Sequence, residues 1–203
     1  MFKLIKIGLL LTAVLLAFEA GKLWQDKCCL QDTLVRVHVV ANSDSQADQE
    51  LKLRVKDAIV SYLMPYMEQI NSRDEALMFL GEHLEQIRLI GQQVLEHAGV
   101  TDNVQVLLEE ESFDTRQYDT FSLPAGHYQT LKVSIGRGEG KNWWCVAFPT
   151  LCMPTDEQTF ADVAASAGLN AELINTITKE DSYELRFFLL DQLGKLENLF
   201  CRK

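Results

Sequence analysis

The N-terminal segment constrains this chain most, because it decides on which side of a membrane the remaining residues fold. Lys3 and Lys6 precede an uncharged, mostly apolar run at residues 7–18. As a helix such a run spans about 18 Å, less than the roughly 30 Å of membrane hydrocarbon. A basic start followed by a short apolar run is typical of a secretory signal or a short anchor. We therefore expect residues 1–20 to direct export, with cleavage and retention as a membrane anchor both open.

The chain that follows this segment is acidic. The 203 residues carry a net charge of -10, and removing residues 1–20, which hold Lys3, Lys6 and Glu19, leaves -11. Such a body is repelled by nucleic acid and by anionic lipid surfaces. We expect no nucleic acid partner, and membrane contact only through the N-terminal segment. The length predicts a linker over residues 21–33 and a single domain over residues 34–203.

Hydrophobic periodicity predicts the fold class. Three segments alternate between apolar and polar residues, as strands of a half-buried sheet do: residues 34–40, 103–111 and 130–136. Ser45 and Ser72 are helix-capping residues, each followed three positions later by an acid, and apolar residues at helical spacing follow both. The helix after Ser45 is expected over residues 46–64, and further helices are expected near residues 156–167 and 183–200. We predict an α+β domain in which amphipathic helices pack on an antiparallel sheet.

The stretch "GRGEGKNWWCVAFPTLCM" at residues 136–153 is unusual. Its glycines do not match the order of a phosphate-binding loop, so Gly136, Gly138 and Gly140 predict a tight turn. Adjacent side chains of a strand point to opposite faces. Trp143 and Trp144 are therefore expected on opposite faces, either both filling the edge of the core or one serving as an interface anchor.

The expected state of the cysteines depends on the compartment in which the chain folds. An exported chain can form disulfides, and an odd count of five leaves at least one thiol unpaired or intermolecular. Cys28 and Cys29 fall in the predicted linker and Cys201 lies near the C-terminus. We predict a disulfide between Cys145 and Cys152, which are seven positions apart in the sequence.

Tests for catalytic and metal-binding patterns give little. The four histidines show no metal-ligand spacing, and H-E-x-x-H, paired C-x-x-C and G-x-S-x-G motifs are missing. We expect no catalytic residues, no metal and no cofactor. Two alternatives stay open: an exported cell-wall hydrolase or thiol enzyme, for instance one using Cys145 with His127, and a structural protein.

A group of polar residues near the first strand has two interpretations. The turn at residues 42–45 is typical of plain helix capping. Together with nearby basic residues it also predicts a polar contact surface. The candidates for partner binding are Arg36, His38, Asn42, Ser43, Asp44, Asp48, Lys52, Lys56, Trp143 and Trp144.

Two segments resemble stage II sporulation protein R. They are "VHVVANSDSQADQELKLRVKDAIVSYL" at residues 37–63 and "LPAGHYQTLKVSIGRGEGKNWWCVAFPTLCM" at residues 123–153. The matching positions include Ala41 to Ser45, Pro124 to Gly126, and Gly138 to Cys152. The combination of N-W-W-C-V with P-x-L-C is specific to that family.

The resemblance implies signalling rather than catalysis. Members of the family are exported from the forespore into the space between the two septal membranes. There they activate a membrane-embedded aspartic-type peptidase, which removes the pro-sequence of a mother-cell sigma factor. We expect this peptidase as the partner, and we expect the two resembling segments to meet in space and to form or support the contact surface.

Overall fold

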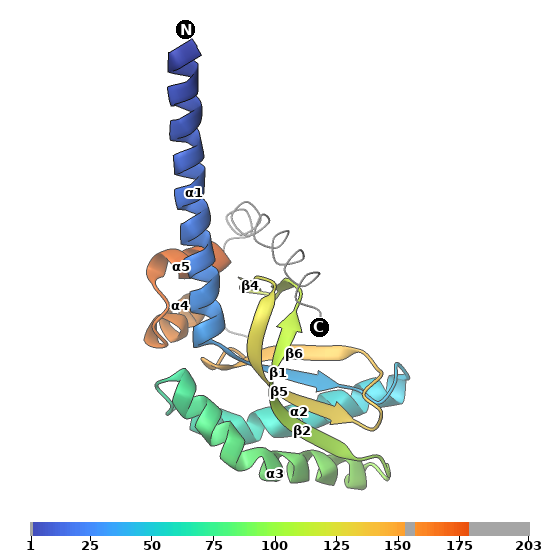
Figure 1. Ribbon diagram of the computed structural model, residues 1–203. Coiled ribbons are helices and arrows are strands. Elements are labelled where there is room, and N and C mark those ends of the chain that lie inside the picture. Colours follow the sequence, from blue (N-terminus) through green and yellow to red (C-terminus); the bar gives the residue numbers. More distant parts are fainter. Residues whose placement is uncertain (1, 153–156, 179–203) are drawn as a thin grey trace.

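A computed structural model describes residues 2–152 and 157–178 (Figure 1). The predicted helix at residues 183–200 lies outside them. The helices are α1 (Phe2–Thr33), α2 (Gln46–Met67), α3 (Arg73–His97), α4 (Glu157–Ser166) and α5 (Ala171–Thr178). The strands are β1 (Val35–Val40), β2 (Val104–Phe113), β3 (Arg116–Gln117), β4 (Ser122–Leu123), β5 (Gly126–Ile135) and β6 (Asn142–Phe148).

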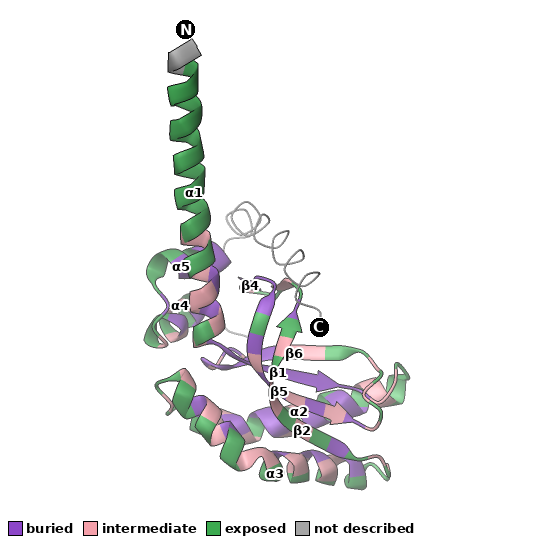
Figure 2. Ribbon diagram, viewed as in Figure 1, coloured by how far each residue is buried: buried purple, intermediate pink, exposed green. Residues whose placement is uncertain are grey.

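Helix α1 joins two environments. Its first part projects from the domain (Figures 1 and 2), and Phe18 there is 70% exposed. By length and composition this helix is apolar enough to cross a membrane. Its last part packs into the domain, where Lys27 and Leu30 are buried. Residues 21–33 are thus helical rather than the linker that the sequence predicted, because apolar side chains at helical spacing bury one face of the helix against the sheet.

Four of the described strands form a mixed sheet in the order β2-β5-β1-β6, and β3 pairs with β4 in a separate hairpin. Strand β1 runs parallel to β5, with Val37 opposite Leu131, and antiparallel to β6. Strands β2 and β5 are antiparallel. The predicted α+β class is confirmed, with one parallel pair at the centre. That pair is possible because α2, α3 and β2 lie between β1 and β5 in the chain and supply the long crossover that parallel strands need.

Each face of the sheet has its own hydrophobic core. Helices α2 and α3 cover one face, where Val37, Leu80 and Leu131 pack together. The end of α1, the β3–β4 hairpin, α4 and α5 cover part of the other face. Figure 2 shows β1 buried along its whole length between these two layers.

Two helices begin as predicted. The Ser45 hydroxyl accepts a hydrogen bond from Asp48 N, and the Ser72 hydroxyl accepts one from Glu75 N. Helix α2 continues past Pro65 to Met67. A proline this close to the end of the helix removes only one backbone hydrogen bond.

Candidate partner-binding surface

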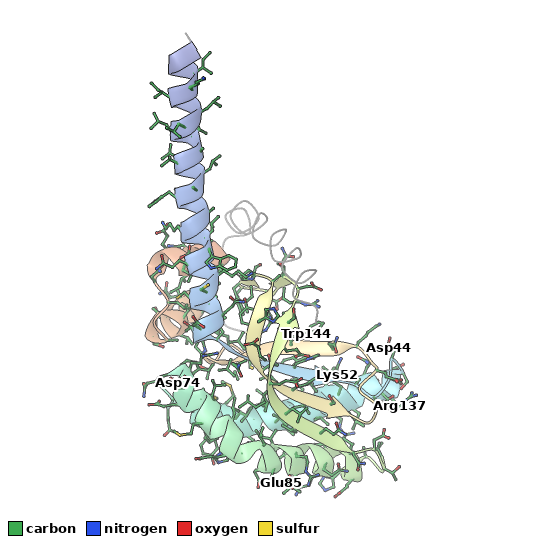
Figure 3. The ribbon with its side chains drawn as sticks, in the orientation of Figure 1. Asp44, Lys52, Asp74, Glu85, Arg137 and Trp144 are labelled. Atoms are coloured by element: carbon green, nitrogen blue, oxygen red, sulfur yellow. The ribbon has the colours of Figure 1, made fainter. Side chains whose placement is uncertain are left out.

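The two segments that carry the family resemblance meet at one end of the sheet. The turn after β1 is bonded to the loop between β5 and β6. Arg137 N donates to Asn42 Oδ1 (3.0 Å), and Lys141 N donates to Asp44 Oδ1 (2.7 Å). Figure 3 shows Asp44 and Arg137 together at this end. We call this contact the turn junction.

Glycines allow the turn junction to close. A Cβ atom on Gly140 would lie 2.3 Å from Ser43 O, and one on Gly136 would lie 2.4 Å from Asn42 Oδ1. Gly136 and Gly138 also adopt positive φ angles of 57° and 62°, which side-chain-bearing residues rarely do. The loop therefore approaches the turn more closely than any other residue type permits.

Asp48 organises the turn from within α2. Its carboxylate accepts hydrogen bonds from the Ser43 hydroxyl and, at 3.3 Å, from Asn42 Nδ2. These bonds, with that of Ser43 the strongest, lower the pKa of Asp48 although its partial burial opposes the shift. Asn42, Ser43 and Asp48 thus bond to one another inside the protein.

Lys52 requires a correction. It was predicted on a contact surface, but it is only 5% exposed. Its ammonium donates to Lys141 O (2.9 Å) and to Gln49 Oε1 (2.7 Å). Burial lowers the pKa of Lys52, and the charge of Asp44 opposes that shift. Lys52 therefore links α2 to the loop before β6 instead of facing a partner.

Arg36 is also corrected. It is fully buried, because β1 lies at the centre of the sheet between two packed layers. Its Nη2 donates to the Tyr118 hydroxyl (2.6 Å), and its guanidinium carbon lies 3.7 Å from the centre of the Phe113 ring. Burial raises the pKa of Tyr118 despite the nearby positive charge. Arg36 ties the β3–β4 region to the sheet.

His38 lies in a polar network on the same face of the sheet. Its Nδ1 is 2.8 Å from Glu111 Oε2, and its Nε2 is 2.9 Å from Asn142 Oδ1. Glu111 also pairs with Lys132 at 3.0 Å. Burial alone would raise the pKa of Glu111, but hydrogen bonds from His38 and Lys132 outweigh it and lower the pKa.

The two tryptophans lie on opposite sides of β6. Trp143 packs against the core formed with α2 and α3, and the Lys56 ammonium lies 5.3 Å from the centre of its ring. Trp144 packs on the other face, stacked on His38, with the Arg116 guanidinium 3.7 Å from its ring centre. Both rings are half-buried, and each has a cation beside it.

A cavity of about 320 Å³ runs along β6 between these rings and the β3–β4 hairpin. Its lining comprises Gln117, Tyr118, Asp119, Thr120, Phe121, Trp143, Trp144, Cys145, Leu151 and Cys152. In the described part of the chain β6 pairs only with β1 and is an edge strand. We call β6 with this cavity the β6 edge.

Among the described residues, the turn after β6 caps part of the outward edge of this strand. Val146 O accepts a hydrogen bond from Leu151 N (3.2 Å), so the following turn covers the outward carbonyl of Val146. Because backbone directions alternate along a strand, Trp144 also turns its N–H and C=O away from β1. The segment Asn142–Val146 carries no charged side chain that would discourage pairing with another strand.

Cys145 and Cys152 lie together in the wall of this cavity as thiols. The Sγ atoms lie 3.7 Å and 3.1 Å, respectively, from Val146 O. The hydrogen bond between the two thiols and burial raise the pKa of Cys152 well above its usual value. Their proximity is compatible with the predicted disulfide, which stays a prediction.

Cys145 and His127 are not brought together. His127 lies near the start of β5 beside Glu110, four residues along that strand from Leu131. Leu131 is itself two strands away from Cys145, with Val37 between them. The described residues contain no group of three side chains able to hold a metal. Sequence reasoning missed Glu111, Arg116 and Tyr118. Glu111 is one of several acids in a predicted strand, and Arg116 and Tyr118 lie in a poorly patterned region where their only signal was charge or aromatic character.

Comparisons with known proteins place this geometry in a family. The family model described as stage II sporulation protein R matches residues 31–158. A protein of Bacillus subtilis (strain 168) named stage II sporulation protein R is 31% identical over 186 residues, covering 82% of this chain and 83% of that protein. No solved structure matches. The chain belongs to the stage II sporulation protein R family.

Proposed function

We propose that this protein is an exported signalling protein that activates a membrane-embedded aspartic-type peptidase. That peptidase then removes the pro-sequence of a mother-cell sigma factor. Membership of a sporulation protein family supports the setting. The apolar N-terminal part of α1 supports export or anchoring, which would put the domain in the space between the septal membranes.

The β6 edge is the observation that best supports a contact surface for the peptidase. Half-buried tryptophans around a cavity are typical of the anchors of protein interfaces. An uncharged edge strand with outward backbone groups can accept a strand from another chain. We infer that an extended segment of the peptidase pairs with β6 near Trp144 and places an apolar side chain in the cavity.

The cations beside β6 indicate the composition of the partner segment. Arg116 and Lys56 lie beside the two rings, one on each face of β6. A partner strand with acidic residues flanking an apolar one would complement both cations. Binding must favour the active arrangement of the peptidase, since a ligand shifts an equilibrium only by its difference in affinity for the two states.

The enzyme alternative gains no supporting observation. Cys145 is 4% exposed, and the structure places His127 well away from it. The raised pKa of the neighbouring Cys152 thiol also disfavours a reactive thiolate in this cavity. We therefore do not advance a thiol enzyme as a second function.

Co-expression in a non-sporulating bacterium tests the proposal. This protein, the peptidase and the pro-sigma factor are produced together, each is omitted in turn, and cleavage is followed by immunoblot. Cleavage should need both this protein and the peptidase. Cleavage that proceeds without this protein would refute the activator role.

A pair of variants tests the surface. Trp144→Ala should lower cleavage about 30-fold, as loss of an interface anchor worth about 2 kcal/mol would. Leu107→Ala is the control, because Leu107 is 52% exposed on the opposite edge strand and in the same row across the sheet as His38 and Trp144. Equal effects of the two variants, with both folded by thermal melts, would rule out the β6 edge as the contact.

A further inference from the structure

A second cavity lies where α1 enters the domain, on the far side of the molecule from the turn junction. It has a volume of about 240 Å³. Its lining comes from α1, the first residue of α3, and strands β2 and β5: Trp24, Lys27, Gln31, Asp32, Arg73, Glu110, His127 and Gln129. Figure 3 labels Asp74, which marks the start of α3 beside this region.

Lys27 is a buried cation without a counter-ion. Only 4% of the residue is exposed. Its ammonium lies 5.2 Å from the centre of the Trp24 ring, and in the described residues it pairs with no carboxylate. A ring face replaces only part of the hydration that an ammonium loses on burial. Residue 126 is glycine where the Lys27 stem and the Gln31 amide press against the backbone.

Arg73 also lines this cavity. Its Nε is buried, and among the described residues it has no hydrogen-bond partner. Carboxylates do line the cavity, but Asp32 and Glu110 are exposed residues at its rim, and Glu110 lies 4.0 Å from His127. Two cationic side chains that line one cavity, with no carboxylate paired to either among the described residues, are the arrangement expected of a site for an oxyanion.

The position of the cavity along α1 places it near the surface of a membrane that α1 would span. The apolar run of α1 ends at Phe18 and is followed by Glu19, Lys22 and Trp24. Lysine and tryptophan are residue types that mark the boundary between hydrocarbon and water. With a rise of 1.5 Å per residue, Lys27 lies only about 4–5 Å further along the helix than Trp24. Lipid headgroups occupy this level when α1 is anchored.

We propose that this cavity binds a phosphate-type oxyanion between Lys27 and Arg73. When α1 is in a membrane, the phosphate of a lipid headgroup is the nearest source. The acidic charge of the whole domain argues against general attraction to anionic lipid, so the affinity comes from this cavity alone. The site is independent of the contact proposed at the β6 edge.

Thermal unfolding of the full chain in maltoside detergent micelles, which contain no phosphate, tests the proposal. Inorganic phosphate or a short-chain phosphatidylglycerol is added at an ionic strength held constant with chloride. Ligand binding to the folded state should raise the unfolding midpoint progressively. A rise with both probes indicates an oxyanion site, a rise with phosphate alone indicates a free anion, and a rise with the lipid alone indicates a headgroup site.

Variants separate a binding site from a structural role. Lys27→Gln removes the unpaired charge but keeps most of the stem, so without added anion its midpoint should equal or exceed that of the wild type. Its response to the effective probe should fall at least fivefold, as should that of Arg73→Gln. Lys22→Gln is the control, since Lys22 is paired with Glu172 outside the cavity. No rise with either probe in the wild type, or an equal loss of response in the Lys22 variant, would overturn the proposal.

Discussion

The turn junction and the β6 edge both looked like binding surfaces in the sequence, but they differ in what their polar groups do. At the turn junction, Asn42, Asp44 and Lys52 form hydrogen bonds with other parts of the same chain. At the β6 edge, Trp144 is half-buried and turns its backbone groups away from its only described strand neighbour. Polar residues close together in sequence can therefore be structural, whereas availability to a partner is decided by what remains unsatisfied.

Charge reversal at two lysines of α2 should have the largest effect and distinguishes the turn junction from the β6 edge. Lys52→Glu would place a carboxylate against Lys141 O and near Asp44, and we expect it to destabilise the fold by about 3–5 kcal/mol. Lys56→Glu should cost less than about 1 kcal/mol, because Lys56 pairs with the exposed Asp57 and its ammonium lies beside the half-buried Trp143 ring.

Urea denaturation of the two purified variants measures both changes. If Lys52→Glu leaves stability unchanged but abolishes peptidase activation, Lys52 faces the partner and the turn junction is functional. If Lys56→Glu alone lowers activation, the contact extends over the Trp143 side of β6.

The predicted Cys145–Cys152 disulfide should have the next largest effect on stability. Closing so short a loop should stabilise the exported protein by about 2–3 kcal/mol, and it would fix the wall of the β6 cavity. Non-reducing digestion with mass spectrometry should find the two residues in one cross-linked peptide. Recovery of both as alkylatable thiols from protein purified out of the exported fraction would contradict the pairing.

Local patterns predicted the elements of this fold better than their arrangement. Alternation and capping residues located β1, β2, α2 and α3, because these signals act within a few residues. Helix α5 was missed in a polar stretch, where its cap, Asn170, accepts a hydrogen bond from Leu173 N. The burial of its apolar side chains against the hairpin is a tertiary effect that periodicity over eight residues does not reveal.

The candidate site depended even more on remote contacts. Arg36 was predicted at the surface because alternation places it opposite the valines of β1, but the second layer that buries it comes from distant parts of the chain. The bonds that occupy Asn42 and Asp44 join residues more than 90 positions apart. Strand order, which makes β6 an edge, also depends on such contacts.

The smallest predicted effect is a change in the pH dependence of stability. It tests whether the hydrogen bonds between His38 and Glu111 hold His38 against Trp144 of the β6 edge. The folded state lowers the pKa of Glu111 from its ordinary value near 4.5. The folded protein therefore binds fewer protons there than the unfolded chain in that range, so this stabilisation is complete above the unfolded pKa and is lost as pH falls through the folded pKa. Glu111→Gln should be less stable than the wild type near neutral pH, by less than about 1 kcal/mol, and the difference should shrink below pH 4.5.

Urea denaturation between neutral pH and pH 3 measures this difference, with Glu110→Gln as the control because Glu110 neighbours it on the strand but is exposed. A constant gap between wild type and Glu111→Gln at all pH values would mean that the carboxylate charge contributes nothing. A shrinking gap accompanied by weaker peptidase activation in Glu111→Gln would show that the network holds His38 under Trp144. The β6 edge would then differ less from the turn junction, because its Trp144 surface would also depend on hydrogen bonds within the protein.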